Sequence, residues 1–260
     1  MRRLAATFAL ARLAALTAVA LPVQLLAVKA GWRLAATLPV WWHRHALEAL
    51  AVRIRVTGTP VVDRPLLVTP NHASWLDIPV IAAQMPISFV AKSEVAEWPL
   101  FGLLAKLQRT VFVDRTRRTA TGSATSELGS RLADGDCMVL FPEGTSWRGD
   151  DVLPFRSALL GAARTAMLHG GHDRVWVQPL TVVYTRLGGL PIGRAERARV
   201  GWYGDIELPA HLWGVFLAGG LDVELVWGEA QPFDETTNRK RLAAALEATV
   251  RRDLLATLRP

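Results

Sequence analysis

The chain has 260 residues, enough for one medium-sized domain with an additional N-terminal segment. Hydrophobic residues make up 51% of it and charged residues 20%, with ten tryptophans and a mean hydropathy of +0.22. This composition excludes an intrinsically disordered chain and suggests contact with lipid. The net charge of +7 favours a polyanionic partner, either an acidic membrane surface or a nucleic acid. A single cysteine, Cys137, excludes an internal disulfide and a cysteine-cluster metal site.

The N-terminal segment is basic at its start, with Arg2 and Arg3, and then strongly apolar, with a longest uncharged run over residues 13–28. A membrane span needs roughly 20 apolar residues, so this run leaves open a full crossing, entry into one leaflet, or a surface position. A cleaved secretory signal is the alternative, but Arg12 inside the apolar stretch argues against it. The aromatic and basic residues within 39–52 suit a lipid headgroup layer, so we predict a retained membrane anchor.

From residue 52 the pattern changes to short apolar runs that alternate with helix-like stretches. The predicted strands cover residues 52–57, 66–69, 88–91, 110–113, 137–141, 175–184 and 221–227. The predicted helices cover residues 75–84, 99–107, 116–133, 155–169 and 238–258. This alternation predicts an α/β fold in which helices flank a central sheet.

A histidine and an aspartate follow the predicted strand at residues 66–69, where His72 precedes Asp77 by five positions. The active sites of open α/β sheets favour such a strand-to-helix loop. Ser74 and Asp77 have the spacing of a capping box, which would place Ser74 at the helix N-cap and aim the carboxylate back toward His72. A carboxylate bonded to one imidazole nitrogen makes the other a better general base for a lipid hydroxyl. From these residues alone, a purely structural cap and loop histidine is an equally open interpretation.

The sequence NHASWLD at residues 71–77 resembles the N-H-x-S-x-x-D block of the glycerolipid acyltransferase family, also called the lysophosphatidic acid acyltransferase family. The second block of that family is matched by residues 89–94, 98–102 and 110–115 together, the third by the F-P-E-G-T of residues 141–145, and a weaker fourth by residues 177–184. Four blocks in the family's order make this a specific match, whereas an isolated histidine and aspartate would be weak support.

The resemblance implies an O-acyltransferase in which His72 deprotonates the acceptor hydroxyl and Asp77 orients His72. The hydroxyl then attacks the thioester of acyl-CoA or acyl carrier protein, with no metal and no bound cofactor. Main-chain N–H groups of the E-G-T turn suit the charge that develops on the carbonyl oxygen, and basic residues suit an anionic headgroup. The residues assigned to substrate binding are Lys92, Arg115, Glu143, Gly144 and Thr145.

The acceptor is the point at which the sequence departs from the family pattern. Many phosphate-using members carry an arginine directly after E-G-T, where this chain has Ser146, with Arg148 two residues further on. Residues 143–159, 202–205 and 211–213 are more similar to a bacterial branch that includes lyso-ornithine lipid acyltransferases. We expect 1-acyl-sn-glycerol-3-phosphate as the acceptor, giving phosphatidic acid in membrane lipid biosynthesis, with lyso-ornithine lipid as the alternative.

The domain organisation that follows has membrane-anchoring helices in residues 1–50 and an acyltransferase domain in residues 51–260. We expect the anchor to hold the domain at the cytoplasmic face of the inner membrane, as a monotopic or single-span protein. More remote alternatives are a thioester hydrolase, in which water replaces the acceptor, and a non-catalytic membrane-binding protein. We predict no nucleic-acid partner, because zinc-finger spacing and aromatic RNA-binding motifs are missing and the basic residues are dispersed.

Overall fold

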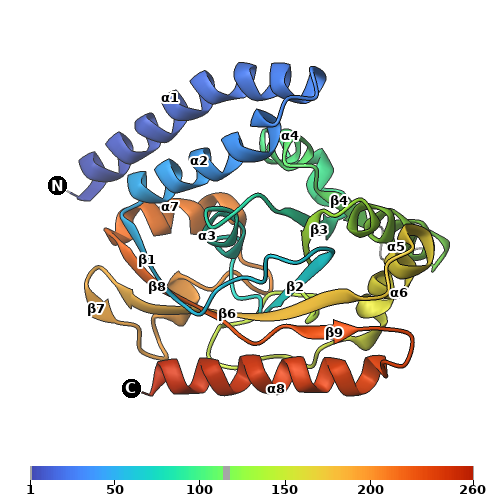
Figure 1. Cartoon of the computed structure of the whole chain (residues 1–260). Coiled ribbons are helices and arrows are strands. Elements are labelled where there is room, and N and C mark those ends of the chain that lie inside the picture. The colour runs from blue at the N-terminus through green and yellow to red at the C-terminus, as the bar shows by residue number, and fades with distance from the viewer. Residues whose placement is uncertain (1, 114–117, 260) are drawn as a thin grey trace.

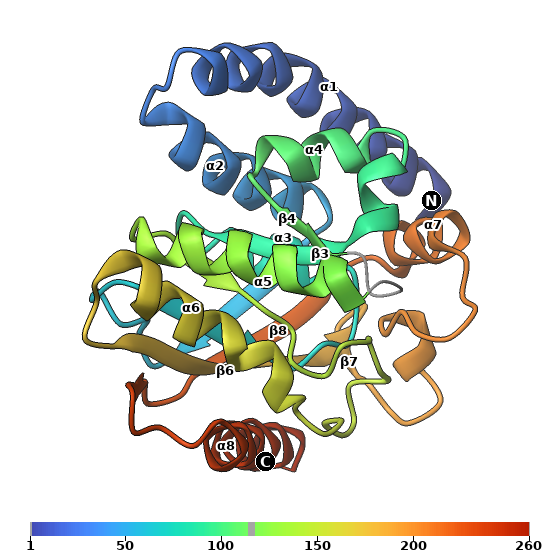
Figure 2. The same ribbon diagram turned by 90° about the vertical axis from the view of Figure 1, so that its right-hand side faces the viewer.

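The structure, a computed structural model, describes residues 2–113 and 118–259 and is shown in Figure 1. Two N-terminal helices, α1 (Arg2–Lys29) and α2 (Leu34–Ala49), form a hairpin above an α/β domain. Figure 2 shows α4 (Phe101–Leu107) beside this hairpin and α8 (Arg239–Leu258) at the opposite side of the sheet. The predicted α/β class is therefore confirmed.

The described residues form a nine-stranded sheet with the order β1-β8-β6-β2-β5-β3-β4, to which β7 and β9 are added through β6. The strands are β1 (Val52–Thr57), β2 (Leu66–Pro70), β3 (Ser88–Lys92), β4 (Val111–Val113), β5 (Cys137–Val139), β6 (Val175–Leu187), β7 (Leu190–Pro191), β8 (Leu221–Trp227) and β9 (Gln231–Phe233). All seven predicted strands are confirmed, and the short β7 and β9 were not predicted. Neighbouring strands from β6 through β2, β5 and β3 to β4 are parallel, so their carboxyl ends lie at one edge of the sheet.

Helices cover both faces of the sheet, and this explains why β2 is buried along its whole length. One face is covered by α2, α3 (Asp77–Ala82) and α7 (Leu208–Ala218). The other face is covered by α5 (Arg118–Ala133), α6 (Gly161–Gly170) and α8. Short 3-10 helices cover Ser93–Glu97, Ser157–Leu160 and Arg197–Arg199.

The predicted helices are present with some changes at their ends. The helix expected over residues 75–84 is shorter, and the one expected over residues 155–169 begins with a 3-10 turn. In contrast, α7 was not predicted, because it is apolar nearly all round and so lacks the alternation of polar and apolar faces that identifies a helix. The last helix begins after Asn238, whose side-chain oxygen accepts N–H groups of the first turn, and its apolar stripe is buried as predicted.

The first helix, α1, is long and apolar enough to cross a membrane, by length and composition. Its contacts are with α2, α4 and α7, and they bury mainly small side chains such as Ala20 and Ala27. Large apolar side chains remain outside this packing: Leu4 is 76% exposed and Phe8 is 73% exposed. A soluble domain rarely presents such a surface, so α1 is the part of the described chain best suited to contact lipid.

Candidate active site

The predicted pair, His72 and Asp77, meets where the loop after β2 enters α3. His72 Nδ1 lies 2.8 Å from Asp77 Oδ2, and the Asp77 side chain is fully buried. The same carboxylate oxygen accepts the main-chain N–H groups of Ala73, at 2.7 Å, and Ser74, at 3.0 Å. The carboxylate thus fixes both the imidazole and the loop that carries it.

The capping box predicted here forms only in part, and Ser74 is not the N-cap residue. The carboxylate of Asp77 does bond the Ser74 N–H, but the Asp77 N–H donates to the Ser74 carbonyl oxygen at 3.1 Å. That N–H is therefore not available to the Ser74 hydroxyl, which is buried with no partner among the described residues. The helix begins two residues later than predicted, with Leu76 as its N-cap residue.

A further neighbour of Asp77, which no sequence pattern indicates, is the hydroxyl of Tyr184 on β6. It donates to Asp77 Oδ1 at 2.6 Å, so both carboxylate oxygens are bonded. Burial, together with the nearby charge of Asp77, raises the pKa of Tyr184 well above its usual value, so the phenol remains a donor. In the sequence Tyr184 is only the last residue of an apolar block, and the residues around it are buried on both faces of the sheet.

The imidazole of His72 stacks on Phe141 from the third block, with ring centroids 4.0 Å apart and planes inclined by 25°. The His72 side chain keeps 19% of its surface exposed, and its Nε2 has no hydrogen-bond partner within the described residues. Since Nδ1 is bonded to a carboxylate, the imidazole can carry its proton on Nδ1 and present the lone pair of Nε2. This arrangement fits a general base.

The main chain of His72 is held from both sides by the loop that follows β5. Its N–H donates to Glu143 Oε1 at 2.8 Å, and its carbonyl oxygen accepts the N–H of Trp147 at 2.8 Å. The other oxygen of Glu143 accepts the N–H of Leu153 at 2.9 Å. Burial raises the pKa of Glu143 to about 7, although the two N–H groups oppose this.

The five residues assigned to substrate binding lie in different environments. Glu143 is buried and bonded only to the protein, so the geometry favours a positioning role for it. The N–H of Gly144 donates to the carbonyl oxygen of Phe141 at 3.1 Å as part of the turn, whereas Thr145 is exposed. Lys92 is exposed at the carboxyl end of β3, and Arg115 lies outside the described residues.

Ser146, where the sequence departs from the expected family pattern, is bonded within the protein. Its hydroxyl donates to the carbonyl oxygen of Trp202 at 2.5 Å, and the N–H of Trp202 donates to Ala73 at 2.8 Å. Arg148 lies over the ring of Trp147, 5.5 Å from its centroid, and is 3.5 Å from a carboxylate oxygen of Asp150. No set of three or more His, Cys, Asp or Glu side chains in residues 2–113 and 118–259 is arranged to hold a metal.

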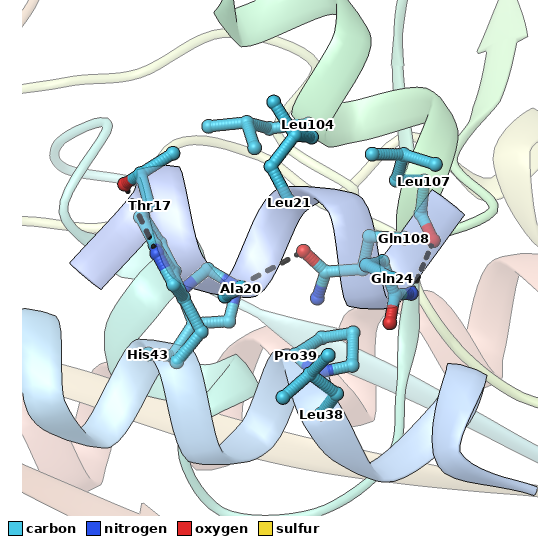
Figure 3. A pocket seen from close by; sticks show the side chains of 11 residues that line it. Thr17, Ala20, Leu21, Gln24, Leu38, Pro39, His43, Leu104, Leu107 and Gln108 are labelled. Atoms are coloured by element: carbon cyan, nitrogen blue, oxygen red, sulfur yellow. Dashed lines mark hydrogen bonds between the residues drawn. The ribbon is translucent and has the colours of Figure 1, made fainter. Parts of the chain in front are cut away.

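A separate pocket lies between α1, α2 and α4, shown in Figure 3. Its walls are mainly apolar, but Gln24 of α1 donates to the carbonyl oxygen of Leu107 at 3.1 Å and so joins the hairpin to the domain. His43 is buried here and lies 3.0 Å from the side-chain oxygen of Gln108, although we expected its segment to face the headgroup layer. Burial lowers the pKa of His43 to about 4, so the side chain is neutral.

Comparison with known proteins identifies the class of this α/β protein as an acyltransferase. The sequence profile of the family described as Acyltransferase matches residues 53–183, and the chain belongs to this family. A lyso-ornithine lipid O-acyltransferase of Brucella abortus is 45% identical over 95% of this chain and 93% of its own length. One from Rhizobium meliloti is 43% identical over 93% of this chain and 82% of its own length.

Enzymes with a different acceptor in their name are also similar. A 1-acyl-sn-glycerol-3-phosphate acyltransferase of Neisseria gonorrhoeae is 29% identical over 79% of this chain and 76% of its own length. The crystal structure of the 1-acyl-sn-glycerophosphate acyltransferase PlsC of Thermotoga maritima superposes with a TM-score of 0.66 at 22% identity, covering 100% of this chain and 99% of that one. This last likeness supports the fold.

Proposed function

We propose that the protein transfers a fatty-acyl group from acyl-CoA or acyl carrier protein to the hydroxyl of a lyso-ornithine lipid. Relatives named for this acceptor are 45% and 43% identical across nearly the whole chain, against 29% for the relative from Neisseria gonorrhoeae. Ser146, in place of the arginine of phosphate-using members, points the same way. The sequence alone favours 1-acyl-sn-glycerol-3-phosphate, and these identities support lyso-ornithine lipid in its place.

The observation that carries the chemistry is the bond between His72 Nδ1 and the buried carboxylate of Asp77. Nε2 of His72 takes the proton of the acceptor hydroxyl as its oxygen attacks the thioester carbonyl, and Asp77 stabilises the imidazolium that forms. The tetrahedral intermediate then expels the thiolate, which takes the proton from His72. The acyl group passes directly to the acceptor, so no acyl-enzyme forms.

Membrane attachment through α1 completes the proposal, because both the acceptor and the product are membrane lipids. The exposed Leu4 and Phe8 would enter the apolar layer, and Arg2 and Arg3 would meet acidic headgroups. The bond from Gln24 to α4 argues for an anchor that is retained rather than cleaved. Since the donors are cytosolic thioesters, we place the active site at the cytoplasmic face of the inner membrane.

The test compares the purified protein with its His72→Ala variant, using a labelled acyl donor, and follows the diacyl product. Acyl-CoA and acyl carrier protein are each paired with lyso-ornithine lipid and with 1-acyl-sn-glycerol-3-phosphate in separate reactions. We expect product that depends on His72, and a higher kcat/KM for lyso-ornithine lipid. His45→Ala, which removes a histidine of α2, is the control and should leave the rate unchanged.

Two outcomes would contradict the proposal. A higher kcat/KM for 1-acyl-sn-glycerol-3-phosphate would return that lipid to first place. Release of free fatty acid from the donor at an unchanged rate without any acceptor, and no diacyl product, would identify a hydrolase instead.

A further inference from the structure

The guanidinium of Arg156, later in the same loop, lies against the E-G-T turn of residues 143–145. The residue that directly follows this turn is Ser146 and not an arginine. Gly144 has a φ of +76°, and a Cβ atom at this position would lie 3.2 Å from both Cζ and Nε of Arg156. The positive φ favours glycine, and a Cβ atom there would be in tight contact with the guanidinium. The Arg156 side chain is exposed and has no hydrogen bond or ion pair with any residue of 2–113 or 118–259.

The main chain of Arg156 is also attached to the loop that holds the general base. Its N–H donates to the carbonyl oxygen of Pro142 at 2.9 Å. Three residues earlier, the N–H of Leu153 bonds the same Glu143 carboxylate that holds the His72 N–H. The main chain that carries Arg156 is therefore tied to the same Glu143 carboxylate as the main chain that carries His72.

We propose that Arg156 binds the carboxylate of the ornithine headgroup and takes the place of the missing arginine at residue 146. This inference rests on the proposed function. A guanidinium and a planar carboxylate form two parallel hydrogen bonds, whereas Ser146 has its hydroxyl committed to Trp202. Arg148 is the other guanidinium of this loop, but it lies over Trp147 and already faces Asp150.

The experiment measures steady-state kinetics of Arg156→Gln and Arg156→Lys with two acceptors, lyso-ornithine lipid and its headgroup methyl ester. We expect Arg156→Gln to raise the KM for lyso-ornithine lipid at least about tenfold, the usual range for a lost charge-assisted hydrogen bond. The methyl ester lacks the carboxylate, so the wild type and Arg156→Gln should use it equally well. Arg156→Lys keeps the charge but cannot form the two parallel hydrogen bonds. Its KM for lyso-ornithine lipid should lie between those of the wild type and Arg156→Gln.

The matched control is Arg164→Gln, which removes an exposed arginine of α6 and should leave both KM values unchanged. A higher KM for the acyl donor would mean that Arg156 binds an anionic group of the donor, and this would overturn the inference. An equal rise in KM for lyso-ornithine lipid and for its methyl ester in Arg156→Gln would also overturn the inference. So would a rise in the KM for lyso-ornithine lipid in Arg148→Gln and not in Arg156→Gln.

The failure of the inference is distinguishable from the failure of the proposed function. If the wild type acylates lyso-ornithine lipid and Arg156→Gln matches it, only the inference is wrong. If the wild type does not acylate that lipid at all, the proposed function is wrong and the inference with it. Circular dichroism and a thermal unfolding midpoint of each variant show whether a change in KM comes from loss of structure.

Discussion

The hydroxyl of Tyr184 lies 2.6 Å from Oδ1 of Asp77, the carboxylate oxygen that His72 does not use. Oδ2 accepts the imidazole and two main-chain N–H groups, so Tyr184 is the side chain that fixes the second oxygen. A buried oxygen without its donor is costly, and the carboxylate would then be held through Oδ2 alone.

We therefore expect Tyr184→Phe to lower kcat about tenfold or more, while the KM values for acceptor and donor stay close to the wild type. The free energy of unfolding should fall by roughly 1–3 kcal/mol, because Asp77 Oδ1 loses its donor. Steady-state kinetics and denaturant unfolding measure the two effects. Tyr203→Phe, which changes the chain's other tyrosine, is the control, and an unchanged kcat in Tyr184→Phe would contradict the positioning role.

Glu143→Gln separates the role predicted from the sequence from the role that the geometry favours. Glutamine offers one oxygen in place of two, so either the His72 N–H or the Leu153 N–H would lose its acceptor. We expect a loss of about 1–3 kcal/mol in unfolding free energy and a lower kcat with an unchanged acceptor KM. Glu229→Gln, at an exposed position, should change neither. A higher acceptor KM with an unchanged kcat would restore the substrate-binding role.

His43 makes stability depend on pH, because its folded pKa of about 4 lies below the usual value of 6.5. Between these values the unfolded chain binds a proton that the folded chain does not. The stability that neutral His43 provides is present above pH 6.5 and is lost as the pH falls toward 4, by an amount on the order of 3 kcal/mol.

Replacing this histidine by a residue that does not titrate should weaken the pH dependence. We expect unfolding midpoints of His43→Gln to change less between pH 7.5 and pH 4.5 than those of the wild type, as measured by denaturant titration in detergent. His45→Gln is the control, since its side chain is not in the pocket. An identical slope in the wild type and His43→Gln would show that other groups cause the acid sensitivity.

Leu4 and Phe8 lie one helical turn apart on α1 and are both largely exposed. If they enter the lipid, each contributes about 1.5–3 kcal/mol of transfer free energy. The double substitution Leu4→Gln and Phe8→Gln should therefore lower binding to vesicles of phosphatidylcholine and phosphatidylglycerol at least about tenfold in a flotation assay. The control is Val62→Gln, which changes a side chain of the α/β domain that is 88% exposed. An equal loss of vesicle binding in this variant would contradict the role of α1.

Most of the sheet could be predicted because each central strand is a short apolar run bounded by polar or turn residues. His72 and Asp77 could be paired because they share one loop and helix start. The contact of Tyr184 with Asp77 could not be predicted, because the two residues are 107 positions apart. Since β6 is buried on both faces, no alternation of polar and apolar residues shows toward which face of the sheet Tyr184 points. Arg156 was missed for a similar reason, since its approach to Gly144 depends on how the loop folds back.

The double attachment of His72 to the loop after β5 has a consequence for the evolution of the acceptor. The base is held by the Glu143 carboxylate and the main-chain N–H of Trp147, while neighbouring side chains such as Thr145 are exposed. A substitution at such an exposed position leaves both hydrogen bonds to the His72 main chain in place, so the base does not move. One catalytic loop can thus be inherited by enzymes that diverge in their acceptor lipids.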